Sequence, residues 1–327
     1  MGELNMKKSF SNTLFLLIML YVLIGILKNP KSVLSNATHG LNTWFNIVIP
    51  SLLPFFMVSE ILINIGFVNL VSRILTPLMK PIFNVSGAGA FSLSMSLMSG
   101  YPIGAKIVSN LRQNNAITKL EADRMVCFSS TSGPLFILGA ISVGMLNNPL
   151  LGPLIIYPHY LGALTVGILL RFYGTKKSYT QDYSNKVEGK LILDENLSIG
   201  SVLANSVRNS ISTIALIGGF IIFYSVLTEL IFLSKPFNIL TSLINRKVLI
   251  DIEILKGFVA GILELTTGCE RISNAHIDTI YKIAIINFLV GWSGISVHSQ
   301  ALSFMGSTDI NNKLYLFSKF FHGLFSS

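Results

Sequence analysis

The most informative property of this sequence is how little charge it carries. Only 12% of its 327 residues are charged, whereas a soluble domain has about 25%, and 51% are hydrophobic. This composition excludes an ordinary soluble enzyme or signalling domain. We predict an all-α polytopic membrane protein, because helices satisfy their own backbone hydrogen bonds within a bilayer.

Cysteine and the common catalytic motifs are also scarce. The two cysteines, Cys127 and Cys269, lie far apart and support neither a disulfide framework nor a metal motif. The absence of G-x-x-x-x-G-K-[ST] excludes ATP hydrolysis by a P-loop, and neither H-E-x-x-H nor G-x-S-x-G occurs. The five histidines show no metal-ligand spacing. We therefore expect no cofactor, no bound metal and no enzymatic activity.

Basic residues outnumber acidic ones, and the net charge is +9. In a soluble protein this balance could indicate nucleic-acid binding, but no surface of interleaved basic and aromatic residues supports that interpretation. In a membrane protein, basic residues collect in cytoplasmic loops. We expect the lipid bilayer as a partner and no nucleic acid, and a homo-oligomer is one option for the assembly.

Two apolar segments are interrupted by residues that break helices. Residues 92–110 read SLSMSLMSGYPIGAKIVSN, in which Gly100, Pro102 and Gly104 precede Lys106. Residues 257–274 read GFVAGILELTTGCERISN. Irregular backbone at membrane depth is tolerated only where protein or a water-filled cavity covers it. A matched pair of such segments in the two halves of a chain points to a solute-binding site.

The two halves of the chain repeat the same order of features. Each half has a span that ends in Glu, a polar loop, an interrupted segment, a span with a small-polar cluster, and a final span. Counting the crossings from an inside N-terminus makes the repeats inverted, as in many secondary transporters. The final segment, residues 314–325, is short for a span, and we expect it to be terminal or interfacial. The predicted organisation is an N-terminal transmembrane helix and connection (1–40), a first repeat (41–173), a cytoplasmic linker (174–197) and a second, inverted repeat (198–327).

Three motifs of this sequence resemble the sporulation integral membrane protein YlbJ family. They are PSLLPFF (50–56), SGYPIGAK (99–106) and SSTSGPLFILG (129–139). That family carries the nucleoside-recognition Gate domain and is similar to the core of concentrative nucleoside transporters. The resemblance covers most of residues 40–325, and the first repeat would be Gate-like. It implies a re-entrant helical hairpin and a broken transmembrane helix in each repeat. It also implies movement of dipicolinic acid during endospore formation, in the cell or forespore membrane of a spore-forming bacterium.

A small carboxylated solute requires backbone N–H groups and positive helix ends. Two hairpin tips that face each other would supply them. For the first tip we predict Ser99, Gly100, Tyr101, Pro102 and Gly104, with Tyr101 placed to stack on an aromatic ring. For the second tip we predict Thr266, Thr267 and Gly268. The alternative is that these glycines only permit close packing of helices.

Two charged side chains belong to the interrupted segments. Lys106 could attract an anionic substrate, or it could extend to the membrane interface. Glu264 could bind a coupling proton or cation, or it could form a structural ion pair with Lys106 or Arg271.

The two small-polar clusters offer hydroxyl groups where helices unwind. They could bind substrate or Na⁺, and the alternative is ordinary hydrogen bonding between helices. His298 beside the second cluster is either functional or a satisfied helix residue. The predicted binding residues in these clusters are Ser130, Thr131, Ser132, Gly133, Ser293, Gly294, Ser296 and His298.

Three kinds of function are compatible with this pattern. The first is a secondary transporter of a small carboxylated solute, dipicolinic acid on the family resemblance, with a proton or Na⁺ as coupling ion. A nucleoside or another small anion is the alternative substrate. The second is a non-transporting membrane scaffold of spore assembly, and the third, an intramembrane enzyme, lacks an identifiable nucleophile–base pair.

Overall fold

The computed structural model describes residues 2–65, 67–174, 198–247 and 251–327, so the predicted linker falls almost wholly outside the described residues. Within these ranges the secondary structure is helical, and they contain no β-strand. The predicted all-α class is confirmed.

Four helical stretches in the described part of the chain are long and apolar enough to cross a membrane: Pro30–Leu62, Pro149–Leu170, Ile199–Leu233 and Thr279–Met305. Large apolar side chains point outward along them, such as Leu34, Leu161, Ile211 and Ile280. Outward-facing apolar surface of this extent suits contact with lipid tails rather than water. The protein is therefore a multi-pass membrane protein, as predicted.

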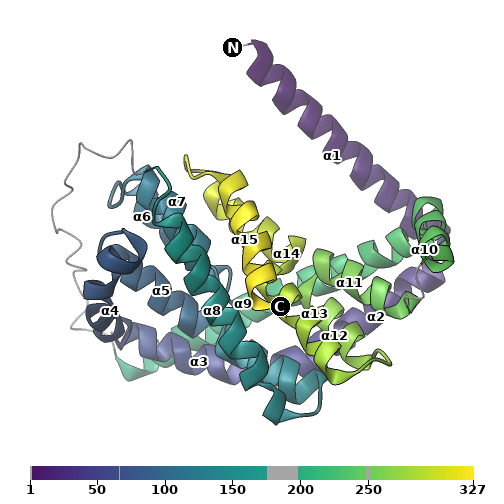
Figure 1. Cartoon of the computed structure of the whole chain (residues 1–327). Helices are drawn as coiled ribbons and strands as arrows, with labels where there is room; N and C mark the ends of the chain where they lie inside the picture. The colour runs from purple at the N-terminus through teal and green to yellow at the C-terminus, as the bar shows by residue number, and fades with distance from the viewer. Residues whose placement is uncertain (1, 66, 175–197, 248–250) are drawn as a thin grey trace.

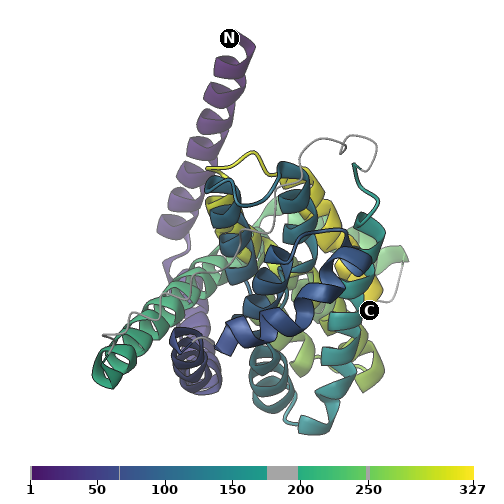
Figure 2. The same cartoon turned by 90° about the vertical axis from the view of Figure 1, so that its left-hand side faces the viewer.

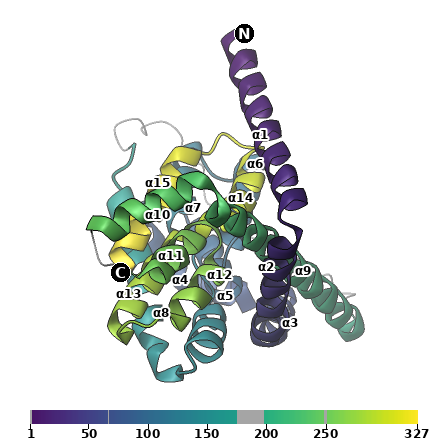
Figure 3. The same cartoon turned by 90° about the vertical axis from the view of Figure 1, so that its right-hand side faces the viewer.

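The N-terminal helix α1 (Gly2–Lys28) projects from the rest of the molecule in all three views (Figures 1, 2 and 3). Where we expected a connection, the chain instead forms α2 (Pro30–Thr43), since Pro30 at the first helical position has no N–H to leave unpaired. Helix α2 runs through the π-helical turn η1 (Trp44–Val48) into α3 (Ile49–Asn64). Both α2 and α3 pack along α9 (Ile199–Leu233).

The first interrupted segment forms a helical hairpin. After α4 (Phe67–Phe83), helix α5 (Ala88–Ser99) ends at Gly100, whose φ of 72° lies in the region that favours glycine. A cis peptide joins Tyr101 to Pro102, and α6 (Ile103–Gln113) begins directly afterwards. Helices α5 and α6 pack against each other, so residues 100–102 are the tip of the hairpin.

The next span is unwound at the first small-polar cluster. Helix α7 (Lys119–Phe128) starts with a capping box between Thr118 and Glu121 and ends at Ser129. Residues 130–133 have no helical structure, and the chain then forms η2 (Phe136–Met145), a run of π-helix. The short η3 (Pro149–Leu151) and α8 (Pro153–Leu170) complete the first half.

The second half repeats this order. After α10 (Lys235–Lys247), helices α11 (Ile252–Leu263) and α12 (Leu265–Asn274) form a hairpin that breaks at Glu264, where the backbone is extended. Helices α13 (Thr279–Trp292) and α14 (Gly294–Met305) are separated at Ser293, which has a φ of 80°. Both predicted interruptions are confirmed, whereas the inverted relation of the repeats stays a prediction.

The last helix, α15 (Asn312–Ser326), buries one face against the rest of the molecule. It packs against α8 and α13, and Tyr315, Lys319 and His322 on it are completely buried. The expectation of a terminal or interfacial segment stays a prediction, and the opposite face of this helix leaves Phe317 and Phe320 exposed.

Candidate functional site

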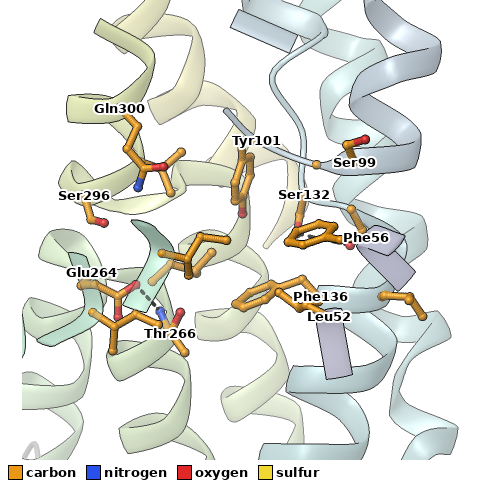
Figure 4. Close-up of a pocket in the computed structure, with 17 residues that line it drawn as sticks. Leu52, Phe56, Ser99, Tyr101, Ser132, Phe136, Glu264, Thr266, Ser296 and Gln300 are labelled. Atoms are coloured by element: carbon orange, nitrogen blue, oxygen red, sulfur yellow. Dashed lines mark hydrogen bonds between the residues drawn. The ribbon is translucent and has the colours of Figure 1, made fainter. Parts of the chain in front are cut away.

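A small cavity of about 60 Å³ lies between the two halves of the molecule (Figure 4). The first half contributes Leu52, Phe56, Ser99, Gly100, Tyr101, Ser132, Gly133, Leu135 and Phe136 to its wall. The second half contributes Ile217, Ile221, Glu264, Leu265, Thr266, Ser296, Val297 and Gln300. The wall thus combines apolar and aromatic side chains with a few polar groups, as small-molecule sites commonly do.

Both hairpin tips reach this cavity. Ser99, Gly100 and Tyr101 belong to the first tip, and Glu264 and Thr266 face them from the other side (Figure 4). A Cβ atom at Gly100 would lie only 2.7 Å from the Gly133 nitrogen. The first tip is therefore in direct backbone contact with the unwound residues that follow α7.

Glu264 is the N-cap of α12. Its buried carboxylate accepts hydrogen bonds from Thr266 N (3.0 Å), Thr267 N (2.7 Å) and Thr267 Oγ1 (2.9 Å). The expectation that the second tip presents unoccupied amides is wrong for Thr266 and Thr267, because a resident carboxylate already takes them. The ion-pair alternative is also wrong, since no ion pair among the described residues joins Glu264 to Lys106 or Arg271.

Two other helix N-termini near the cavity have no such cap. Helix α6 begins after Pro102 and α14 begins after Ser293, and in neither case does the N-cap side chain bond a backbone N–H. Tyr101 beside the first start and Ser296 in the first turn of α14 both line the cavity. Helix N-termini attract anions, and no lysine or arginine of the described residues lines the cavity. Glu264 places a carboxylate in the wall, so within the wall itself the first turn of α14, at Ser296, is the group that favours an anion.

The remaining predicted residues lie outside the cavity wall. They are Pro102, Gly104, Lys106, Ser130, Thr131, Thr267, Gly268, Ser293, Gly294 and His298. Lys106 is exposed, and its ammonium lies 5.8 Å from the centroid of the Phe304 ring. This position matches a lysine that extends to the interface rather than one that contacts a solute.

Gly104 and Gly268 are sites of close backbone contact. A Cβ at Gly104 would lie 1.7 Å from the Ser129 carbonyl oxygen, and one at Gly268 would lie 2.1 Å from the Gly261 Cα. At these two positions glycine permits close packing of helices, which is the alternative to a role in solute binding.

Several hydroxyl groups of the first cluster bond the first hairpin instead of the cavity. Ser92 Oγ donates to Ser129 Oγ (2.9 Å), and Ser96 Oγ lies 3.0 Å from Thr131 Oγ1 and accepts from Thr131 N (3.1 Å). These bonds hold the hairpin against the unwound segment. Thr131 therefore makes structural hydrogen bonds of the ordinary kind rather than contacts with a solute or Na⁺.

Two groups of residues at the site were not predicted from the sequence. The first is the apolar wall, of which Leu52 and Phe56 belong to the quoted PSLLPFF motif but received no role. The second lies directly behind the wall: Lys319 donates to the Ser130 carbonyl, and His159 Nε2 accepts from Ser132 N at 2.9 Å. A lysine inside an otherwise apolar final segment was the signal that could have revealed this second group.

Comparisons with known proteins agree with this architecture. A family model described as Gate, nucleoside recognition, matches residues 45–149, which include the first hairpin and the unwound segment. The sporulation integral membrane protein YlbJ of Bacillus subtilis (strain 168) is 34% identical to this chain, over 98% of the chain and 83% of that protein. No solved structure matches. At this identity and coverage, the chain belongs to the family of the sporulation integral membrane protein YlbJ.

Proposed function

We propose that the protein is a secondary transporter of a small carboxylated solute, and that the solute is dipicolinic acid during endospore formation. The observation that carries this proposal is that two interrupted hairpins, one from each half, bring their tips to one cavity. Transporters built from repeats place their solute at such a junction. The Bacillus subtilis relative is a sporulation integral membrane protein, which supports a role in the cell or forespore membrane.

The chemistry of the wall suits an aromatic dicarboxylate. Tyr101, Phe56 and Phe136 present aromatic rings to the cavity, and offset or edge contacts between rings stabilise aromatic ligands. The uncapped N-terminus of α14 reaches the cavity at Ser296 and can attract a carboxylate group, and that of α6 begins directly after the lining residue Tyr101.

The cavity is too small for the solute in the conformation described. Its volume is about 60 Å³, whereas pockets for small molecules have about 300–1,000 Å³. Solute binding therefore requires the hairpin tips to separate. Movement of one hairpin relative to the other is the motion that alternating access needs.

A nucleoside is the second candidate solute, because the matching family model is described as nucleoside recognition. Ser296, Thr266 and Gln300 could supply hydrogen bonds to a base or a ribose. A non-transporting scaffold is the remaining alternative, and it would need neither the cavity nor its polar groups.

Counterflow in proteoliposomes tests these functions. Vesicles that contain the full-length protein and unlabelled dipicolinate should accumulate labelled dipicolinate, and empty vesicles should not. Excess dipicolinate should compete with the label and a nucleoside should not. Competition by nucleosides alone would favour the alternative solute, and no accumulation of either compound would favour the scaffold.

A further inference from the structure

Lys319 on α15 is buried without a counter-ion. Its side chain is 0% exposed, and its ammonium donates to the Ser130 carbonyl and lies 3.3 Å from His322 Nδ1. None of the ion pairs among the described residues includes it. A basic side chain buried within a membrane protein is costly when charged and usually marks a functional pathway.

The hydrogen bonds around Lys319 fix the protonation of two histidines. His322 Nε2 lies 2.8 Å from the His159 carbonyl and must donate to it, so His322 Nδ1 is the acceptor that faces Lys319. His159 Nε2 accepts from Ser132 N, so the proton of that ring is on Nδ1, which has no hydrogen-bond partner. Both rings are neutral in this arrangement, which leaves Lys319 as the group that can carry the positive charge.

Among the described residues, no acidic side chain on the helices packed around α15 forms an ion pair with Lys319. The titratable groups that interact with Lys319 are His159 on α8, Cys127 on α7, His298 on α14 and His322 on α15, and Tyr315 on α15 lies 3.2 Å from His298 Nδ1. On α13, Lys282 donates to the Ser273 carbonyl and Tyr281 is exposed. Asp123 on α7 accepts from Asn311 N at 2.7 Å instead.

The Lys319 cluster is joined to the cavity wall through the unwound segment. Lys319 binds the Ser130 carbonyl, while His159 and Tyr160 bind the nitrogen and the carbonyl of Ser132 at 2.9 and 3.1 Å. Ser132 itself lines the cavity. Lys319 therefore bonds the unwound segment two residues before the lining residue Ser132, and charges interact strongly over short distances in a medium of low dielectric.

We propose that Lys319 is the proton-binding group of this site, and that an anionic solute binds together with one proton. This inference rests on the proposed function. A proton from solution adds to the lone pair of the neutral Nζ amine and gives the ammonium, and no other bond changes. The two acceptors, Ser130 O and His322 Nδ1, match the two N–H donors of the neutral amine, so both states keep the hydrogen bonds described. By linkage, an anion in the cavity favours the protonated lysine, and the protonated lysine favours the anion.

Calorimetric titration of the purified full-length protein with dipicolinate tests this inference. Repeating the titration in buffers of different ionisation enthalpy measures the number of protons taken up. We expect about one proton per dipicolinate, and an affinity that falls about tenfold for each pH unit above the range in which Lys319 is already charged. Lys313→Met, an exposed lysine on the same helix, should leave both results unchanged.

Lys319→Arg is the decisive variant, because a guanidinium stays charged. It should bind dipicolinate without proton uptake and with little dependence on pH. If this variant does not fold, His322→Gln is the second test. It replaces one hydrogen-bond acceptor of Lys319 and should shift the pH range over which dipicolinate binding takes up a proton.

The outcomes separate the two proposals. Dipicolinate binding by the unmodified protein without proton uptake would overturn the role of Lys319 alone. Proton uptake that persists in Lys319→Arg would also overturn that role. So would a pH profile of dipicolinate binding that is unchanged in His322→Gln. No binding of dipicolinate at any pH would overturn the proposed function and this inference with it.

Discussion

Replacing Gly104 by alanine should separate the first hairpin from the unwound segment. The new Cβ would lie 1.7 Å from the Ser129 carbonyl oxygen, and real Cβ contacts essentially never fall below 3.0 Å. The two backbones must therefore move apart by the difference, about 1.3 Å. The backbone fixes the position of the Cβ, and its partner is a main-chain atom, so no change of rotamer can relieve the contact.

The expected loss of stability follows from the bonds across this contact. Three hydrogen bonds join Ser92 and Ser96 of the hairpin to Ser129 and Thr131. Hydrogen bonds between membrane helices contribute about 0.6 kcal/mol each on average, and overpacking costs about 1–3 kcal/mol. The sum is about 3–5 kcal/mol, and for a chain of 327 residues we expect the midpoint of thermal unfolding to fall by roughly 4–7 °C.

A thiol-reactive fluorogenic dye can follow this unfolding in detergent. The chain has two cysteines, and both Cys127 and Cys269 are buried, so they report on loss of the core. Gly219→Ala is the matched control, because no atom lies within 4 Å of its new Cβ. Its expected effect is at most about 1 kcal/mol, in the stabilising direction.

A midpoint for Gly104→Ala within about 2 °C of the unmodified protein would refute the close contact between α6 and Ser129. An equally large loss in Gly219→Ala would show that helix glycines are sensitive throughout this protein, and it would remove the argument from backbone contact.

Three further predictions concern single side chains. Glu264→Ala leaves Thr266 N and Thr267 N without their acceptor. It should lower the free energy of unfolding by about 2–4 kcal/mol, as measured in the dye assay. The control Glu253→Gln, on the exposed face of α11, should change that free energy by less than about 0.5 kcal/mol. Tyr101→Ala should weaken dipicolinate binding up to about tenfold in calorimetry through loss of the ring contact, and Tyr101→Phe should weaken it much less. Hydrogen bonds from the Arg112 guanidinium, at 2.8 and 3.0 Å, lower the pKa of Asp309. The pKa of Asp309 in the folded protein therefore lies below the unfolded value of about 4. Above that pH, Asp309→Asn should lower the free energy of unfolding by at most about 1 kcal/mol. This difference from the unmodified protein should vanish as the pH falls through the pKa of the folded state.

Much of the architecture was predictable because it depends on local sequence. Low charge and long apolar runs indicate a helical membrane protein. Gly100 and Pro102 mark the tip of the first hairpin, since a positive φ favours glycine and proline cannot continue a helix. The second interruption was also predicted, although Glu264, rather than a glycine or a proline, ends the helix there.

The composition of the cavity wall was less predictable, because it depends on which segments meet. Serine and threonine have the same chemistry in either role, and only their neighbours show that Ser132 lines the cavity while Thr131 bonds Ser96. Lys106 looked like a site residue from its motif, but its position on α6 directs it outward. The orientation of a polar side chain on a helix is set by packing, which the motif does not encode.

By itself, then, the sequence determined that this is a helical membrane protein with an interrupted segment in each half, because breaks and apolar runs are properties of neighbouring residues. Only the tertiary structure decided that Glu264 caps its own hairpin and that the tips share a cavity with Ser132. It also decided that Lys319 lies behind that cavity, bonded to a residue 189 positions away. Contacts of this kind depend on how the helices pack across the whole chain, and no short stretch of residues specifies them.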